Sequence, residues 1–243
     1  DILNTPEVNI STIEDPVEYQ MPRINQTQVK PDIGFTFASG LRSLMRQDPD
    51  IIMVGEIRDS ETASLAINAS LTGHLVLATV HANSAPGTVA RLIDMGVEPF
   101  LLVSTLHVTI GQRLVRRLCE SKESYILSAN EKSDLAKIVD MDRILRTLQD
   151  EGVVQKGATW NTIPFYHPKP TQECEDGYKG RIGIHEVLRM SPPIKDIVMA
   201  KGTADDIKAQ GQKEGMLTMA EDGIFKAVLG QTTIEEVLRV VSE

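Results

Sequence analysis

The chain has 243 residues, of which 41% are hydrophobic, and a formal net charge of −9. This length and apolar content suffice to bury a core, as one large domain or as one domain with a small appendage. The acidic balance argues against a broad nucleic-acid-binding surface, because such binding rests on Lys and Arg neutralising backbone phosphates. No apolar run approaches the ~20 residues that a membrane-spanning helix needs.

The chain contains two cysteines, Cys119 and Cys174, and no apolar leader opens it. These features fit a reducing, cytoplasmic setting better than a disulfide scaffold. Basic residues gather in "QRLVRRLC", residues 112–119, which predicts a small electropositive site. Because the first residues lack an initiator Met and lead at once into a strand pattern, we expect the chain to be cut from a longer one.

The first elements expected along the chain are a strand and a helix. The strand covers residues 9–13 and ends in the acidic turn 14–16, because the proline at its end cannot donate to a sheet. The helix lies in "FTFASGLRSLMRQD", whose apolar residues recur at helical spacing. This spacing places Arg42 and Arg46 four residues apart on one helix face.

Two further pairs of a strand and a helix follow. Residues 51–54 and 74–81 read as continuous apolar strands, both buried. Residues 59–73 and 83–97 read as helices, each with a polar N-cap residue and a closing glycine. Apolar strands that alternate with helices are typical of a parallel sheet with helices on both faces, so we expect an α/β core.

The second half of the chain has a different character. Residues 119–178 are polar and then proline-rich, with one helix expected within residues 131–149, and we interpret them as a subdomain outside the main sheet. "GRIGIHEVLRM" returns to strand, and three or four short amphipathic helices follow from residue 192. We therefore expect an α/β core over residues 1–118, an insertion subdomain over 119–178, and the last core strand with a C-terminal helical bundle over 179–243.

Three polar residues stand where expected strands end. Glu14 ends the first strand, Glu56 the second and His81 the third. In a parallel α/β sheet the strand ends meet at one edge, where ligands bind, so these groups can converge on a γ-phosphate, a Mg²⁺ ion and an attacking water. Mg²⁺ needs only one or two carboxylates besides phosphates and water. Each residue alone is more often structural or solvated, so the prediction rests on their combination.

Several stretches in order resemble the motifs of one family. "STIEDPVEY" resembles the Asp box, "RQDPDIIMVGEIRD" the Walker B segment and "LTGHLVLATVHANSA" the His box of the secretion ATPases that power type II secretion and type IV pilus assembly. "TIGQRLVRRLC", "GYKGRIGIHEVL" and "DGIFKAVLGQTTIEEVLRVV" extend the resemblance over nearly the whole chain. The resemblance implies a hexameric, RecA-like motor that hydrolyses ATP with Mg²⁺.

The resemblance also implies roles for residues. Glu14 matches the glutamate proposed to activate the attacking water, and Glu56 the glutamate that orders Mg²⁺ and water, although some accounts exchange the two roles. Mg²⁺ would be held through both, by way of water. His74 and His81 match the His-box pair, with His81 at the γ-phosphate. The remaining positions that it places around the nucleotide or the subunit boundary are Asp15, Glu18, Asp50, Arg42, Arg46, Arg58 and Arg91.

Two departures from the family pattern stand out. No G-x-x-x-x-G-K-[ST] loop occurs, so the cradle for the β- and γ-phosphates is missing, and we expect this fragment alone to hydrolyse ATP poorly. Assembly-type members also carry two C-x-x-C pairs that bind zinc, whereas Cys119 and Cys174 each stand alone. Two thiolates cannot close a tetrahedral site, so we expect no zinc and two idle thiols. Rescue by His167 or His185 is the lesser alternative.

Three functions compete on these observations. The first is a cytoplasmic homo-hexameric ATPase, held at the inner membrane through a platform protein and a cytoplasmic adaptor, without nucleic acid. The second is a RecA-like nucleic-acid translocase, which would need a basic channel. The third is a non-catalytic assembly module, which the missing phosphate loop would suit. The insertion after Cys119 favours the assembly or secretion branch over retraction, and the residues do not separate pilus assembly from type II secretion.

Overall fold

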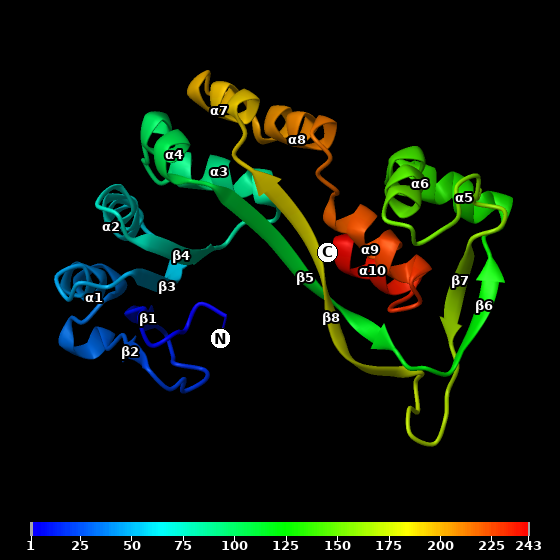
Figure 1. The fold of residues 1–243 in the computed structure, drawn as a ribbon, viewed down its shortest axis with the longest axis horizontal. Coiled ribbons are helices and arrows are strands. Elements are labelled where there is room, and N and C mark those ends of the chain that lie inside the picture. The colour runs from blue at the N-terminus through cyan, green and yellow to red at the C-terminus, as the bar shows by residue number, and fades with distance from the viewer. Residues whose placement is uncertain (1, 243) are drawn as a thin grey trace. The chain divides into compact units, whose positions relative to one another are not determined.

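The computed structural model describes residues 2–242 (Figure 1). The chain divides into two compact units, one of Asp1–Thr109 with Arg189–Gln210, the other of Ile110–Leu188 with Gly211–Glu243. The divisions fall within strands β5 (Val108–Leu118) and β8 (Tyr178–Arg189) and helix α8 (Ala204–Lys213). The three-part division expected from the sequence stays a prediction.

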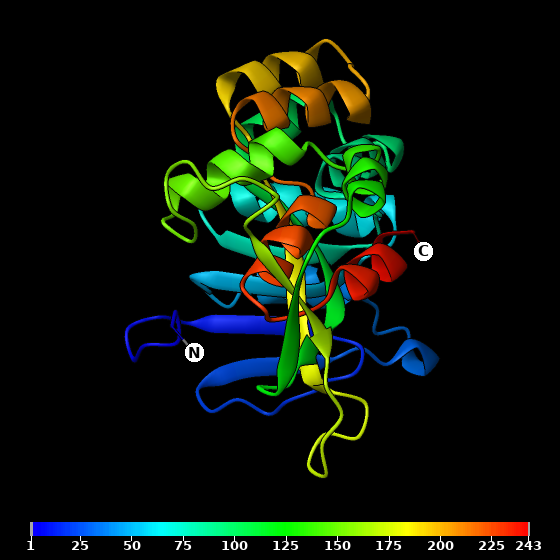
Figure 2. The same cartoon turned by 90° about the vertical axis from the view of Figure 1, so that its right-hand side faces the viewer.

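The first unit contains a four-stranded sheet in the order β2-β1-β3-β4, and the pairs β1/β2, β1/β3 and β3/β4 are all parallel. Its strands are seen side by side, coloured blue to cyan, in Figure 2. This confirms the expected α/β fold with a parallel sheet. The strands are β1 (Ile10–Glu14), β2 (Ile24–Gln28), β3 (Ile51–Ile57) and β4 (Leu75–Val80).

Helices α1 (Phe37–Leu44) and α2 (Ser60–Leu71) pack against this sheet and against each other. Thr36 caps α1 through a reciprocal capping box with Ser39, and Asp59 caps α2 by accepting the Thr62 N–H. Sheet residues such as Ile13, Ile52 and Val54 are fully buried. Because α1 ends at Leu44, Arg46 lies beyond it, and the prediction that Arg42 and Arg46 share a helix face was wrong.

Strand β4 is more exposed than its sequence predicted. We expected a buried strand, but Leu75 and Leu77 are 49% and 44% exposed. The reason is its position: β4 stands at the edge of the four-stranded sheet and pairs only with β3 in the described chain. An apolar run predicts a strand, yet it does not fix how many neighbours that strand has.

Three further helices belong to the first unit. They are α3 (Ala85–Asp94), α4 (Pro99–Thr105) and α7 (Pro192–Met199), and a short 3-10 turn (Pro31–Ile33) precedes α1. Ser84 caps α3 as expected, and α4 lies against α7. Within residues 2–242, no helix is both long enough and apolar enough to cross a bilayer.

The second unit combines two small sheets with helices. β5 pairs with β8, and β6 (Lys122–Ile126) pairs antiparallel with β7 (Pro164–Pro168). The single helix expected within residues 131–149 is in fact two, α5 (Ala129–Ala136) and α6 (Met141–Asp150). Asp140 separates them because its side chain accepts the Arg143 N–H and so starts a new helix. Helices α9 (Met219–Val228) and α10 (Ile234–Ser242) complete this unit.

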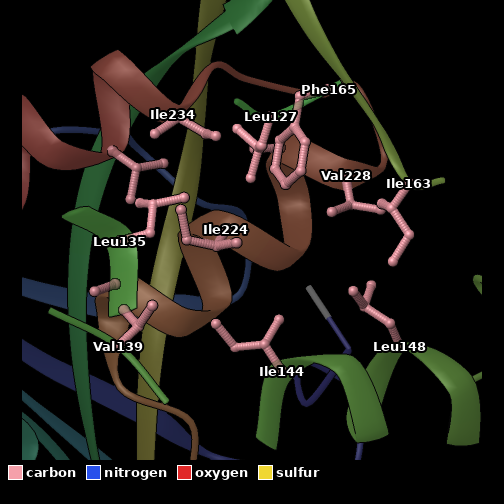
Figure 3. Close-up of a cluster of buried hydrophobic side chains, with 13 residues drawn as sticks. Leu127, Leu135, Val139, Ile144, Leu148, Ile163, Phe165, Ile224, Val228 and Ile234 are labelled. Atoms are coloured by element: carbon pink, nitrogen blue, oxygen red, sulfur yellow. The ribbon is translucent and has the colours of Figure 1, made fainter. Parts of the chain in front are cut away.

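An apolar core joins the helices of the second unit. Figure 3 shows Ile144 and Leu148 of α6 facing Ile224 and Val228 of α9, with Phe165 of β7 beside them. All five side chains are buried, four of them at 1% exposure or less. Burial of this kind stabilises by about 1.5–3 kcal/mol per large side chain, so this core fixes α6 against α9.

Arg116, in the basic segment of β5, forms ion pairs. Arg116 donates to Glu236 at 2.6 Å and to Asp176 at 3.2 Å, and its guanidinium lies 4.1 Å from the centre of the Tyr178 ring. Arg113 donates to the Val240 carbonyl. The expected electropositive site is therefore wrong for Arg116, because carboxylates distant in sequence neutralise it.

The two cysteines are bonded to each other. Cys119 and Cys174 form a disulfide across a sequence separation of 55 residues, and the Cys119 N–H also donates to the Gly177 carbonyl. The expectation of two idle thiols was wrong. Sequence spacing carries no information on their distance, whereas the fold brings the end of β5 and the loop before β8 together.

Glu236 is expected to stabilise the second unit in a pH-dependent way. Burial alone would raise its pKa, but hydrogen bonds from Arg116 and Arg239 outweigh burial and lower the pKa to about 2 from 4.5. This stability is present above about pH 4.5 and is lost as the pH falls through about 2. Glu236→Gln should therefore lower the free energy of unfolding by roughly 3 kcal/mol at neutral pH, and by progressively less in acid.

Urea unfolding followed over this pH range measures the effect. The control is Glu235→Gln, because the neighbouring Glu235 side chain is 61% exposed, and it should change stability by less than about 0.5 kcal/mol. If the difference in unfolding free energy between wild type and Glu236→Gln stays constant from neutral to acid pH, the assigned pKa of Glu236 is wrong.

Loss of the disulfide should also destabilise the second unit. The double variant Cys119→Ser, Cys174→Ser is expected to lose roughly 2–4 kcal/mol of unfolding free energy, because the cross-link no longer restricts the unfolded chain. Urea unfolding without reductant tests this, and wild type with reductant should match the variant. If both cysteines of unreduced, denatured wild type react with an alkylating reagent, the bond is absent and the prediction fails.

Candidate functional site

The candidate site lies at the edge of the sheet where β1, β3 and β4 end. Glu14 is the last residue of β1, Glu56 the penultimate residue of β3, and His81 directly follows β4. Both glutamates are buried residues, Glu14 at 9% and Glu56 at 8% exposure. Since the three strands are parallel and adjacent, these residues share the carboxyl edge, where ligands of α/β sheets bind.

A bulge in β3 positions Glu56. Val54 pairs with Ala78 and Ile57 with Val80, so three steps along β3 match two along β4, and β3 contains one extra residue. Bulges redirect side chains and recur near active sites. At Gly55, a Cβ atom would lie 3.1 Å from the Ile13 carbonyl oxygen and 3.3 Å from Glu14 Cα, so glycine lets the two backbones approach closely.

One oxygen of Glu56 receives two partners. Arg58 Nε donates a short hydrogen bond to Oε2, and His81 Nε2 lies 2.9 Å from the same atom. The hydrogen bond from Arg58 lowers the pKa of Glu56 most; burial opposes this shift, and His81 adds to it. The Glu56 hydrogen bond raises the pKa of Arg58 in turn, and the charge of Asp15 contributes. Glu56 is therefore held as a carboxylate.

One oxygen of Glu14 is held in the same way. Thr12 Oγ1 donates to Oε1 at 2.5 Å, and Gln26 Nε2 donates to Oε1 at 3.1 Å. Within residues 2–242, neither Glu14 Oε2 nor Glu56 Oε1 makes a hydrogen bond. Each carboxylate thus has one oxygen fixed by the protein and one oxygen directed elsewhere.

A recess of about 880 Å³ borders Glu14 on one face of the sheet. Most of its wall is apolar, and Glu14, Glu18 and Gln26 contribute polar atoms. Its apolar lining comes mainly from Ile10, Ile24, Ile51, Met53 and Leu77. An apolar wall does not suit phosphate groups, so the recess does not itself form an anion site.

Two residues predicted for the site lie at the amino ends of the strands, opposite the carboxyl ends where Glu14 and Glu56 stand. Asp50 precedes β3, and its Oδ2 accepts the Asn9 N–H at 2.7 Å. His74 precedes β4, and its Nδ1 lies 2.9 Å from the Ala69 carbonyl oxygen at the end of α2. Both make local structural contacts, and the structure does not bring them to Glu14 or Glu56.

The predicted arginines are dispersed over the first unit. Arg42 pairs with Glu61 at 2.7 Å on the surface. Arg46 and Arg91 are exposed, and in the described part of the chain their side chains form no ion pair. Only Arg58 is held against one of the two carboxylates.

Sequence reasoning missed Thr12 and Gln26. Thr12 carried a usable signal, because residues two apart on a strand share a face, which places its hydroxyl beside Glu14. Gln26 carried none, because "INQTQ" has no apolar run and β2 was not predicted.

The oxygen atoms of this edge suit Mg²⁺. Glu14 Oε2 and Glu56 Oε1 are hard donors with no protein hydrogen bond in residues 2–242. The described residues contain no group of three or more His, Cys, Asp or Glu side chains placed as a metal site. Mg²⁺ commonly binds through one or two carboxylates and completes its shell with water and phosphate oxygens, so the residues present fit this ion.

Comparison with solved structures shows the class of fold. The chain superimposes on the pilus retraction motor PilT with bound ADP at a TM-score of 0.63 and 24% identity, over 96% of this chain and 52% of that chain. The structure therefore has a RecA-like fold.

Sequence comparison shows the family. Residues 1–239 match the profile described as "Type II/IV secretion system protein". The chain is 49% identical over 242 residues to type II secretion system protein E of Xanthomonas campestris pv. campestris, and 47% identical over 235 residues to the type IV pilus assembly ATPase PilB of Thermus thermophilus. The chain belongs to the type II/IV secretion system protein family.

The match covers part of each relative. It includes 99% of this chain but 40% of the Xanthomonas protein, and 96% of this chain but 24% of the Thermus protein. The 243 residues thus correspond to less than half of either relative.

Arg58→Ala should raise the pKa of Glu56, because the Arg58 hydrogen bond is the main cause of its lowering. Carboxyl ¹³C NMR titration of the purified chain measures this. The matched control is Arg42→Ala, which removes a guanidinium paired with Glu61 and should leave Glu56 unchanged. If the Glu56 titration is the same in Arg58→Ala and wild type, the assigned contact does not hold this carboxylate.

Proposed function

We propose that this chain is the C-terminal portion of a hexameric motor that hydrolyses ATP to drive type IV pilus assembly or type II secretion. The observation that carries the proposal is the pair of buried carboxylates, Glu14 and Glu56, at the carboxyl ends of adjacent parallel strands. Family membership supports it, since relatives bear the names type II secretion system protein E and type IV pilus assembly ATPase PilB.

In this proposal Glu14 and Glu56 have different tasks. Glu14 accepts a proton from the attacking water through Oε2, the oxygen that makes no hydrogen bond within residues 2–242. Glu56 would hold the Mg²⁺ ion and its water through Oε1, while Arg58 and His81 hold Oε2. Mg²⁺ supplies positive charge to the phosphate oxygens when bound. A fixed carboxylate needs little reorganisation as charge develops in the transition state.

The basic residues act on the phosphates and at the subunit boundary. His81 is 78% exposed at the end of β4, so it is accessible to the γ-phosphate. Arg58 forms an ion pair with Glu56 and also feels the negative charge of Asp15. Its guanidinium can contact a phosphate group. The dispersed positions Arg42, Arg46 and Arg91 are assigned to phosphate or partner contacts across the boundary. An arginine placed on the transferred phosphate is worth roughly 10³–10⁵ in rate.

The proposed motor is a homo-hexamer in the cytoplasm. It works against an inner-membrane platform protein with a cytoplasmic adaptor, and it associates with the membrane through them. We assign residues 1–118 to the ATPase core, 119–178 to an insertion subdomain, and 179–243 to the last strand and the C-terminal helices. The disulfide and the β6–β7 sheet fall within or at the border of the insertion.

Hydrolysis by this chain alone is proposed to be poor. Its 243 residues contain no G-x-x-x-x-G-K-[ST] sequence, so the backbone cradle for the β- and γ-phosphates must come from elsewhere. A nucleic-acid translocase on the same fold is less well supported, because the chain is acidic and Arg116 of its basic segment is paired with Glu236.

Glu14→Gln and Glu56→Gln, each in the full-length protein, should lower ATP turnover by about 100-fold or more, because loss of a positioned base or metal ligand removes transition-state stabilisation. Steady-state phosphate release at saturating ATP measures the effect. The control is Glu98→Gln, an exposed residue whose side chain does not cap α4, and it should turn over normally. Turnover within about tenfold of wild type, or ~1.4 kcal/mol in the barrier, would refute these roles.

A further inference from the structure

We infer that Thr12 and Gln26 are positioning residues that aim the Glu14 carboxylate during hydrolysis. This inference rests on the proposed function, because it concerns the carboxylate taken there as the base. Neither residue touches nucleotide or water in this role. They act by fixing one oxygen of Glu14, and the other oxygen is thereby presented to the reactants.

Thr12 fixes Glu14 along its own strand. The two residues are separated by two positions on β1 and therefore share a face of the sheet. Thr12 is 3% exposed, and its hydroxyl donates to Oε1 at 2.5 Å. A β-branched side chain has a restricted χ1, so the hydroxyl has little freedom to turn elsewhere.

Gln26 fixes the same oxygen from the neighbouring strand. Its backbone pairs with Thr12 in the parallel register of β1 and β2. Its Nε2 donates to Glu14 Oε1 at 3.1 Å and to the Tyr19 carbonyl at 2.8 Å, and its Oε1 accepts the Met21 N–H at 2.7 Å.

These contacts decide the orientation of the Gln26 amide. The Met21 N–H can bond only to the amide oxygen, and the Tyr19 carbonyl only to the amide nitrogen. The NH₂ group must then face Glu14. The segment between β1 and β2 thus holds the amide, and the amide holds the carboxylate as its hydrogen-bond acceptor.

Two donors on one oxygen have a consequence for catalysis. They restrict rotation of the Glu14 carboxylate about its Cγ–Cδ bond, so Oε2 points in one direction instead of several. A base held in its reactive geometry avoids the entropy loss of finding that geometry in each turnover. The expected signature of losing a donor is a lower kcat with an unchanged KM, because ATP binding does not depend on Oε2 being aimed.

The experiment uses the full-length protein with paired substitutions. Thr12→Val removes the hydroxyl and keeps the shape, whereas Thr12→Ser keeps the hydroxyl. Gln26→Glu keeps the acceptor for the Met21 N–H but replaces the donor to Glu14 with a carboxylate oxygen, which both releases and repels Oε1. Asn25→Asp makes the same amide-to-carboxylate change one residue away, where the amide donates to Asn9 instead.

We expect Thr12→Val and Gln26→Glu each to lower kcat by about tenfold, because each loses roughly one hydrogen bond in the transition state. The KM for ATP should stay within about twofold of the wild-type value. Thr12→Ser and Asn25→Asp should keep kcat within about twofold of wild type. In a Glu14→Gln background, Thr12→Val should have no further effect on kcat, because the carboxylate that it positions is gone.

The outcomes separate this inference from the function on which it rests. If Glu14→Gln abolishes turnover while Thr12→Val and Gln26→Glu keep wild-type kcat, the positioning role is wrong and the base assignment stands. If both variants raise KM with kcat unchanged, or lower kcat equally in the Glu14→Gln background, the two residues are structural and the inference is overturned. If Glu14→Gln itself keeps turnover within about tenfold, the assignment of Glu14 as base fails first.

Discussion

The site depends on the close approach of the β1 and β3 backbones at Gly55. A Cβ atom there would lie 3.1 Å from the Ile13 carbonyl oxygen and 3.3 Å from Glu14 Cα, so glycine keeps the two strands close where Glu14 and the bulged residue Glu56 stand. The bulge adds one residue to β3 relative to β4 just before the strand ends. Arg58 and His81 then act on Glu56, and Thr12 and Gln26 act on Glu14.

The carboxylates of Glu14 and Glu56 are held in a similar way. Each has one oxygen with two partners from the protein and one oxygen without a hydrogen bond in residues 2–242. The partners differ in charge, however: neutral donors hold Glu14, whereas a cation and an imidazole hold Glu56. Neutral donors orient the Glu14 carboxylate without placing a cation against it, while an adjacent cation keeps Glu56 ionised as a metal ligand. The different surroundings therefore agree with the different tasks proposed.

Local features of the sequence predicted the strands β1, β3 and β4 and the helices α1, α2 and α3, because apolar runs, proline and cap residues act over a few positions. They also predicted the carboxyl-edge position of Glu14, Glu56 and His81. Contacts across long separations could not be predicted. The Arg116–Glu236 pair, the Cys119–Cys174 bond and the Gln26–Glu14 hydrogen bond all depend on how distant segments meet. Asp50 and His74 lie away from Glu14 and Glu56 for a simpler reason: each precedes its strand, and residues before parallel strands lie at the opposite end of the sheet from residues that follow them.

Helix α9 begins at a capping box, in which Thr218 Oγ1 accepts the Glu221 N–H and the Glu221 carboxylate accepts the Thr218 N–H. Glu221 bonds the Thr218 N–H as part of a local cap, and the same buried carboxylate accepts from Arg143 of α6 at 2.7 Å. Left without Arg143, this charge would be buried unpaired, which is strongly unfavourable. The Glu221 cap of α9 is therefore stable only when α6 is folded and Arg143 pairs with it. Although about 70 residues of sequence lie between them, the two helices are expected to form and melt in one cooperative step.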